Sequence, residues 1–211
     1  MFARRPTTII SPFELNNEGY GQALVLRYAG CNLKCPLCYA WRYAWIIRNG
    51  YRYSIKNSIN ALENLPRVAG KKIVWVRIQG GEPCLTFCRI LHTIRFAALS
   101  LNIIHTNGLN YFTTTRAIIQ TNAIKFSTLT TIQIKQILSN LQKSLSNIEK
   151  GKLIFEISLK SPNDLNYLAP QINGYKVLLN QIITPLWRQG FENIAVYLSL
   201  IHISEPTRPR L

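Results

Sequence analysis

Acidic residues are scarce in this sequence. Nine Asp and Glu stand against 25 Lys and Arg, Asp164 is the only aspartate, and no acid occurs from Gly19 to Leu62. The formal net charge at pH 7 is therefore +16. Such an excess of one sign favours an anionic partner, and an RNA substrate is one partner of this kind.

Other absences exclude whole classes of protein. Charged residues make up only 16% of the chain and hydrophobic residues 47%, which excludes a disordered composition. No internal repeat or low-complexity linker occurs, so the 211 residues are expected to form one domain. No apolar run reaches transmembrane length and no apolar segment follows Arg4-Arg5, so we predict a cytoplasmic protein with no membrane span.

Three of the five cysteines are crowded into eight residues, as Cys31, Cys35 and Cys38. Their C-x3-C-x2-C spacing is too tight for independent packing in the core. A cubane iron–sulfur cluster has four irons, each needing a ligand such as Cys. The next cysteine along the chain is Cys84, so the pattern predicts a cluster with one open iron, where a cofactor can bind.

The alternative for this segment is a structural zinc site. Zinc normally takes four ligands, often as two separated pairs, and no His follows the triad at finger spacing. Cys84 and Cys88 stand four residues apart. They are candidates for a second cluster or a redox pair, although free cysteine is most often a core residue.

Strands and helices alternate along the chain. Apolar, β-branched runs predict strands at Gln22–Tyr28, Ile73–Gln79, Leu101–Thr106, Lys152–Leu159 and Asn193–Ser199. Helical patterns occupy Ser54–Leu65, Leu85–Leu99, Tyr111–Gln120, Thr130–Glu149 and Asp164–Gln189, the last interrupted by Pro170, Gly174 and Pro185. This alternation predicts an α/β fold with a parallel sheet.

Polar or glycine-rich motifs follow the predicted strands. They are the cysteine loop, Gly80-Gly81-Glu82-Pro83, Thr106-Asn107-Gly108 and Ser158-Leu159-Lys160. In parallel α/β folds the carboxyl ends of the strands carry the active site. We therefore expect all four motifs to meet at one edge of the sheet.

The cysteine spacing and the GGEP motif together closely resemble the radical S-adenosylmethionine (radical SAM) superfamily. The resemblance implies a partial (β/α)6 parallel barrel, here cut short after about five strands. It also implies a [4Fe–4S] cluster on Cys31, Cys35 and Cys38, with S-adenosylmethionine chelating the open iron. Such an enzyme cleaves this cofactor reductively to a 5′-deoxyadenosyl radical, which abstracts hydrogen from its substrate.

The same resemblance implies which residues bind the cofactor. Gly80, Gly81, Glu82 and Pro83 match the motif that binds the methionine amino group. Asn107, Ser158 and Lys160 match strand-end elements of compact activating enzymes, although Ser158 replaces an aspartate, and Glu156 is a substitute ribose ligand on the same strand face. An electron donor of the reductase, flavodoxin or ferredoxin type is implied as a partner.

The substrate is left open between two types. Lys160, after the fourth predicted strand, favours a compact activase-like or 7-carboxy-7-deazaguanine-synthase-like enzyme. The high net positive charge favours an RNA-modifying enzyme instead. Tyr39–Tyr53 interleaves aromatics with Arg42, Arg48 and Arg52 and suits base stacking and phosphate contacts. A non-catalytic iron–sulfur or zinc protein that binds nucleic acid is the alternative from another class, but it leaves GGEP unexplained.

The last residues of the chain resemble translated sequencing-adaptor sequence. We therefore expect a radical SAM core domain over residues 1–198 and an artefactual or disordered tail over 199–211.

Overall fold

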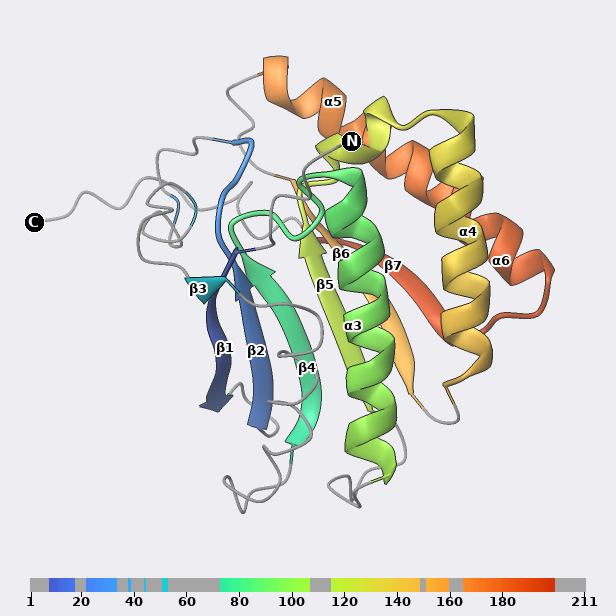
Figure 1. Ribbon diagram of the computed structural model, residues 1–211. Helices are drawn as coiled ribbons and strands as arrows, with labels where there is room; N and C mark the ends of the chain where they lie inside the picture. Colours follow the sequence, from blue (N-terminus) through green and yellow to red (C-terminus); the bar gives the residue numbers. More distant parts are fainter. Residues whose placement is uncertain are drawn as a thin grey trace, which may run out of the picture.

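A curved seven-stranded sheet forms the centre of the structure (Figure 1). The structure is a computed structural model that describes residues 8–17, 22–33, 38, 44, 51–52, 73–106, 115–148, 151–159 and 165–199. Its strands are β1 (Thr8–Asn17), β2 (Gln22–Tyr28), β3 (Tyr51–Arg52), β4 (Ile73–Gly80), β5 (Arg116–Thr121), β6 (Lys152–Ser158) and β7 (Ile194–Ser199). Their spatial order is β3-β1-β2-β4-β5-β6-β7.

The five strands β2, β4, β5, β6 and β7 are parallel to one another. They confirm the predicted α/β fold with a five-stranded parallel sheet, as in a partial barrel. Strand β1 extends this sheet antiparallel to β2, and β3 pairs antiparallel with β1. Strands β1 and β3 were not predicted from the sequence. Ser199, assigned to the tail above, is the last residue of β7.

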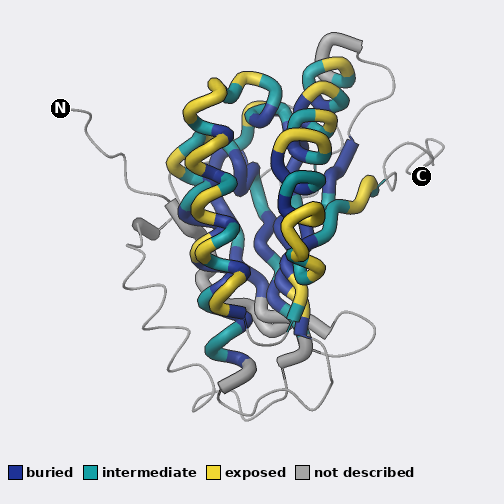
Figure 2. The backbone as a smooth tube through the Cα atoms, turned by 90° about the vertical axis from the view of Figure 1, so that its right-hand side faces the viewer, coloured by how far each residue is buried: buried dark blue, intermediate teal, exposed yellow. Residues whose placement is uncertain are grey.

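The described helices are α3 (Phe87–Thr106), η2 (Ile124–Thr128), α4 (Thr131–Ser146), α5 (Leu165–Val177), η3 (Leu178–Ile183) and α6 (Thr184–Arg188). They cover one face of the sheet, and their exposed residues gather on the outward side (Figure 2). Helix α4 confirms its prediction: Thr130 and Gln133 form a capping box, and Ile134, Ile137, Leu141 and Leu145 face the core.

For two segments the sequence analysis predicted the wrong type of secondary structure. Leu101–Thr106 was predicted as a strand but is the last part of helix α3, while strand β5 occupies the second half of the predicted helix Tyr111–Gln120. The apolar stripe of α3 continues at helical spacing through Leu101 and Ile104, both buried. That periodicity outweighs the local β-branched composition. Asn107 therefore follows a helix rather than a strand, and it lies outside the described residues.

We had predicted interruptions at Pro170 and Gly174, but the helical run from residue 165 to 188 continues through both residues. Its irregularity is the π-helical segment η3, which directly precedes α6. Pro185 lies in the first turn of α6, where a missing backbone N–H costs least. The predicted helix over 54–65 lies outside the described residues.

Helix α3 bears on the expectation that no apolar run reaches transmembrane length. Over Phe87–Ile104 it is long and apolar enough to cross a membrane by length and composition. More than half of this window is buried inside the protein, where Ile90 and Ile94 pack in the core. Because a core helix passes the same test, the finding is weak evidence for a membrane span.

The close contact between α5 and the turn after β5 generates a prediction. A Cβ atom on Gly174 would lie 2.0 Å from the carbonyl oxygen of Ala123, which no small adjustment can relieve. We expect Gly174→Ala to lower the free energy of unfolding by about 2 kcal/mol, although alanine normally stabilises a helix. Urea denaturation measures this change. The neighbouring exposed variant Asn173→Ala serves as the control and is expected to stay within about 0.5 kcal/mol; equal stability of the two variants would contradict the packing argument.

Candidate functional site

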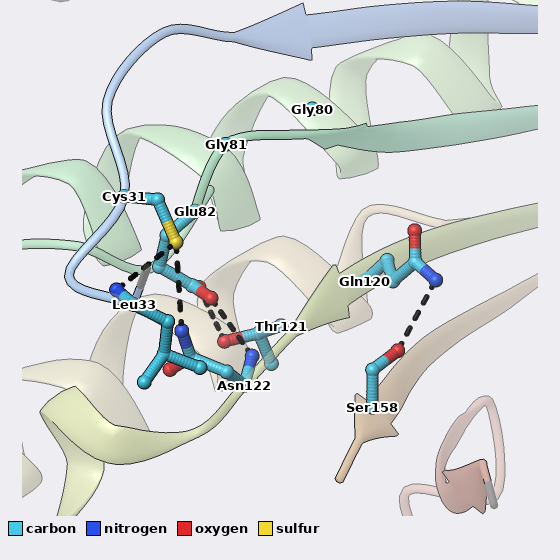
Figure 3. A pocket seen from close by; sticks show the side chains of 9 residues that line it. All are labelled: Cys31, Leu33, Gly80, Gly81, Glu82, Gln120, Thr121, Asn122 and Ser158. Atoms are coloured by element: carbon cyan, nitrogen blue, oxygen red, sulfur yellow. Dashed lines mark hydrogen bonds between the residues drawn. The ribbon is translucent and has the colours of Figure 1, made fainter. Parts of the chain in front are cut away.

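A small pocket lies where the carboxyl ends of β2, β4, β5 and β6 meet (Figure 3). Among the described residues it is lined by Cys31, Leu33, Gly80, Gly81, Glu82, Gln120, Thr121, Asn122 and Ser158. The structure thus brings together Cys31, the GGEP loop and Ser158, which sequence analysis placed at one edge. Cys35 and Lys160 lie outside the described residues.

Glu82 is buried at the wall of this pocket, with only 2% of its surface exposed. Its Oε1 accepts hydrogen bonds from the backbone N–H of Cys84 at 2.8 Å and from the Thr121 hydroxyl. Its Oε2 accepts from the backbone N–H of Asn122 at 2.8 Å. A buried carboxylate requires such donors, and here they join the loop after β4 to the end of β5.

The two glycines of GGEP allow the loop to lie directly against the start of the cysteine loop. The N–H of Gly81 donates to the carbonyl of Tyr28 at 2.7 Å, and that of Glu82 to the carbonyl of Gly30 at 2.8 Å. A Cβ atom on Gly81 would lie 2.2 Å from the Gly30 oxygen. Close backbone approach is therefore one reason for glycine here, independent of any ligand.

Arg89, on the first turn of α3, ties the same two loops together. Its Nη1 donates to the carbonyl of Ala29 at 2.8 Å and to that of Glu82 at 3.1 Å. The guanidinium also lies over the Tyr28 ring, 5.1 Å from its centroid. Burial lowers the pKa of Arg89, and the neighbouring Tyr28 and Glu82 oppose this effect. Sequence analysis did not identify Arg89, because a single arginine on a helix is usually solvated.

The sulfur of Cys31 faces nitrogen donors. The backbone N–H of Leu33 donates to Cys31 Sγ at 3.4 Å, and Asn122 Nδ2 lies 4.0 Å from it. Such donors stabilise a thiolate and suit the sulfur ligands of an iron–sulfur cluster. Cys31 and Cys38 are both partly exposed, so they are accessible to a metal. The two described cysteines of the triad, Cys31 and Cys38, therefore suit ligands of an iron–sulfur cluster.

A complete zinc site is not formed elsewhere in the described part of the chain. In those residues, which omit Cys35, no three His, Cys, Asp or Glu side chains converge. Cys84 is buried and Cys88 is exposed, so the predicted pair does not share one environment. Burial raises the pKa of the Cys84 thiol, as does the nearby Glu82, which fits a core residue rather than a metal ligand.

Asn122 is another site residue that sequence analysis did not identify. Besides contacting Glu82 and Cys31, its Nδ2 donates to Oδ1 of Asn32 at 2.7 Å, so it links β5 to the cysteine loop. Thr121-Asn122-Ala123 occupies the strand end that we had assigned to Thr106-Asn107-Gly108. The sequence did contain a signal for Asn122, because Thr121-Asn122 repeats the Thr-Asn pair of residues 106–107, with alanine in place of the following glycine. Ala123 has a φ of 61°, in the left-handed region where glycine is favoured.

Ser158 and Glu156 lie on the same face of β6, as expected, but they have different surroundings. Gln120 Nε2 donates to Ser158 Oγ at 3.1 Å beside the pocket. Glu156 forms an ion pair with Arg77 at 3.3 Å and also accepts from Gln120 at 3.4 Å. The proposed substitute ribose ligand is thus already engaged by an arginine.

The comparisons with known proteins agree with this geometry. Residues 17–151 match the family model described as a 4Fe-4S single cluster domain. The matched residues include the cysteine triad, GGEP and Thr121-Asn122, and Cys31, Gly80, Gly81, Glu82, Thr121 and Asn122 among them line the pocket. No curated protein matches the chain. Because this family match covers more than half of the sequence, the chain belongs to the 4Fe-4S single cluster domain family, a domain of radical SAM type.

Proposed function

We propose that this protein is a radical SAM enzyme. The single observation that supports this most is the pocket itself, where Cys31 and the GGEP carboxylate face one cavity at the carboxyl edge of the sheet. A [4Fe–4S] cluster bound by Cys31, Cys35 and Cys38 would supply the electron for reductive cleavage of S-adenosylmethionine to a 5′-deoxyadenosyl radical. An electron donor of the flavodoxin, ferredoxin or reductase type would be its partner.

The chain's own residues would bind and orient the cofactor. Glu82 is held rigidly by backbone donors, so its carboxylate is positioned to accept from the methionine ammonium group. Ser158, oriented by Gln120, would hydrogen-bond the ribose, and Lys160 the carboxylate. Arg89 and the close Gly81–Gly30 contact would keep the cysteine loop and the GGEP loop in fixed relation.

The high positive charge favours a second candidate, a non-catalytic iron–sulfur protein that binds nucleic acid. Of the basic aromatic stretch Tyr39–Tyr53, the structure describes Ala44, Tyr51 and Arg52. The family match favours the enzyme, because the matched cluster domain is of radical SAM type and includes the GGEP loop, which a non-catalytic cluster protein leaves without a role.

The first prediction concerns the cluster. After anaerobic reconstitution the wild-type protein is expected to hold about four irons per chain. Alanine at Cys31, Cys35 or Cys38 should remove most of this iron, since a two-cysteine site cannot hold the cubane. Cys88→Ala is the matched control, because Cys88 is an exposed thiol outside the triad. Iron analysis and visible absorbance measure the result, and full iron retention in Cys35→Ala would be incompatible with the proposal.

The second prediction concerns Glu82. We expect Glu82→Gln to weaken S-adenosylmethionine binding at least about tenfold, since a charge-assisted bond is worth roughly 1.5–3 kcal/mol. The amide also places a donor against backbone N–H groups, so the free energy of unfolding should fall by about 1–3 kcal/mol. Equilibrium dialysis and urea denaturation measure the two effects, with the exposed Glu192→Gln as control.

Thr121→Val separates a direct role of Glu82 from a purely structural one. It removes one hydrogen bond to the carboxylate but leaves its charge in place. If Glu82 contacts the cofactor, Thr121→Val should keep most of the affinity. An equal loss in both variants would show that Glu82 only holds the loops together.

A further inference from the structure

The face of the sheet opposite the helices is unusually polar. Alternation along the paired strands places the following residues on this inner face: Val25 and Arg27 of β2, Trp75, Arg77 and Gln79 of β4, Arg116, Ile118 and Gln120 of β5, Lys152, Ile154, Glu156 and Ser158 of β6, and Ala195, Tyr197 and Ser199 of β7. In a closed barrel bulky branched residues fill this interior. Of the residues named, only Val25, Ile118 and Ile154 are of that kind, so the face is not built as an apolar core.

A hollow of about 470 Å³ lies on this inner face. Its described lining includes Arg77, Arg116 and Glu156 over a floor of Ile118 and Ile154, with Tyr197 at the open side. This volume falls in the range typical of small-molecule sites, about 300–1,000 Å³. Two arginines against one glutamate give the hollow a net positive charge.

Arg77 is held in place for recognition. Its Nη2 lies 3.3 Å from Glu156 Oε2, and only 21% of the Arg77 side chain and 15% of the Glu156 side chain are exposed. A fixed guanidinium loses little side-chain entropy when it binds an anion and presents several donors in one plane. Arg116 is exposed at the end of the neighbouring strand and adds a second positive charge.

The hollow adjoins the candidate cofactor pocket. Gln120 lines that pocket and donates to both Ser158 and Glu156, so one hydrogen-bonded network spans the two cavities. Arg77 precedes Gly80 by three residues, about 10 Å along the strand. A small molecule bound at Arg77 would therefore extend toward the pocket that contains Cys31.

We propose that this hollow binds the substrate, a small organic molecule with an anionic group, either carboxylate or phosphate. Arg77 and Arg116 bind the anionic group, and the apolar part packs on Ile118, Ile154 and Tyr197. The identification of the ligand as the substrate rests on the proposed function, whereas the anion recognition rests on the hollow alone. A hollow of this volume suits a small molecule, whereas an RNA strand requires an extended positive surface.

Ligand-observed NMR with the full chain tests this inference, using benzoate, phenyl phosphate and neutral benzamide as probes. The two anions are expected to bind at least about tenfold more tightly than benzamide, because charge-assisted bonds to arginine are lost with the neutral probe. The tighter of the two anions identifies the group as carboxylate or phosphate. Arg116→Gln and Arg77→Lys should each weaken binding of the preferred anion about tenfold or more.

Matched controls separate recognition from general charge. The test variant Arg77→Lys keeps a cation beside Glu156, so a loss of binding in it reflects the lost guanidinium geometry and not the lost charge. The control variant is Arg95→Gln, which removes an exposed charge on α3, away from the hollow. Equal binding of benzamide, no binding of either anion, or an equal loss in Arg95→Gln would overturn the inference. Displacement of the bound anion by tRNA would overturn the small-molecule class in favour of RNA. Anion binding without S-adenosylmethionine cleavage would instead remove the proposed function and leave the anion site standing.

Discussion

The buried carboxylate of Glu82 is the interaction on which the carboxyl edge of the sheet depends. A charge with 2% exposure is stable only when donors replace its lost water, and the backbone of Cys84 and Asn122 and the Thr121 hydroxyl supply them. The ends of β4 and β5 are thereby fixed to each other. Asn122 then contacts Asn32 and the Cys31 sulfur, so the same carboxylate indirectly sets the geometry of the cysteine loop.

Backbone proximity supports this arrangement from the other side. Gly81 lies so close to Gly30 that no side chain fits between them, and Arg89 binds carbonyls of both segments. Beneath them Tyr28 is buried against His92, with 2.7 Å between its hydroxyl and His92 Nδ1. Burial lowers the pKa of His92 to about 4, so the imidazole stays neutral and the support carries no extra charge near neutral pH.

The two faces of the sheet have opposite character, and this explains how one open sheet provides both stability and a site. The helix-covered face packs Val76, Ile78, Ile119, Phe155 and Ile157 in the core. The inner face instead carries the Arg77–Glu156 pair and Gln120. Hydrophobic burial on one face stabilises the fold, so the other face is available for polar groups that would destabilise a closed, dry barrel.

The sequence alone determined the features that repeat locally. The runs of β2, β4, β6 and β7 and the stripe of α4 are visible in their periodicity, and the cysteine spacing with GGEP identified the family. Only the tertiary structure decided between residues 101–106 and 116–121 as the third strand, because both runs have similar composition and differ in the partner they pack against. It also decided that Asn122 rather than Asn107 follows that strand, and that Glu82 and Arg77 pair with residues 39 to 79 positions away. Such contacts depend on strand order in space, which local sequence patterns do not encode.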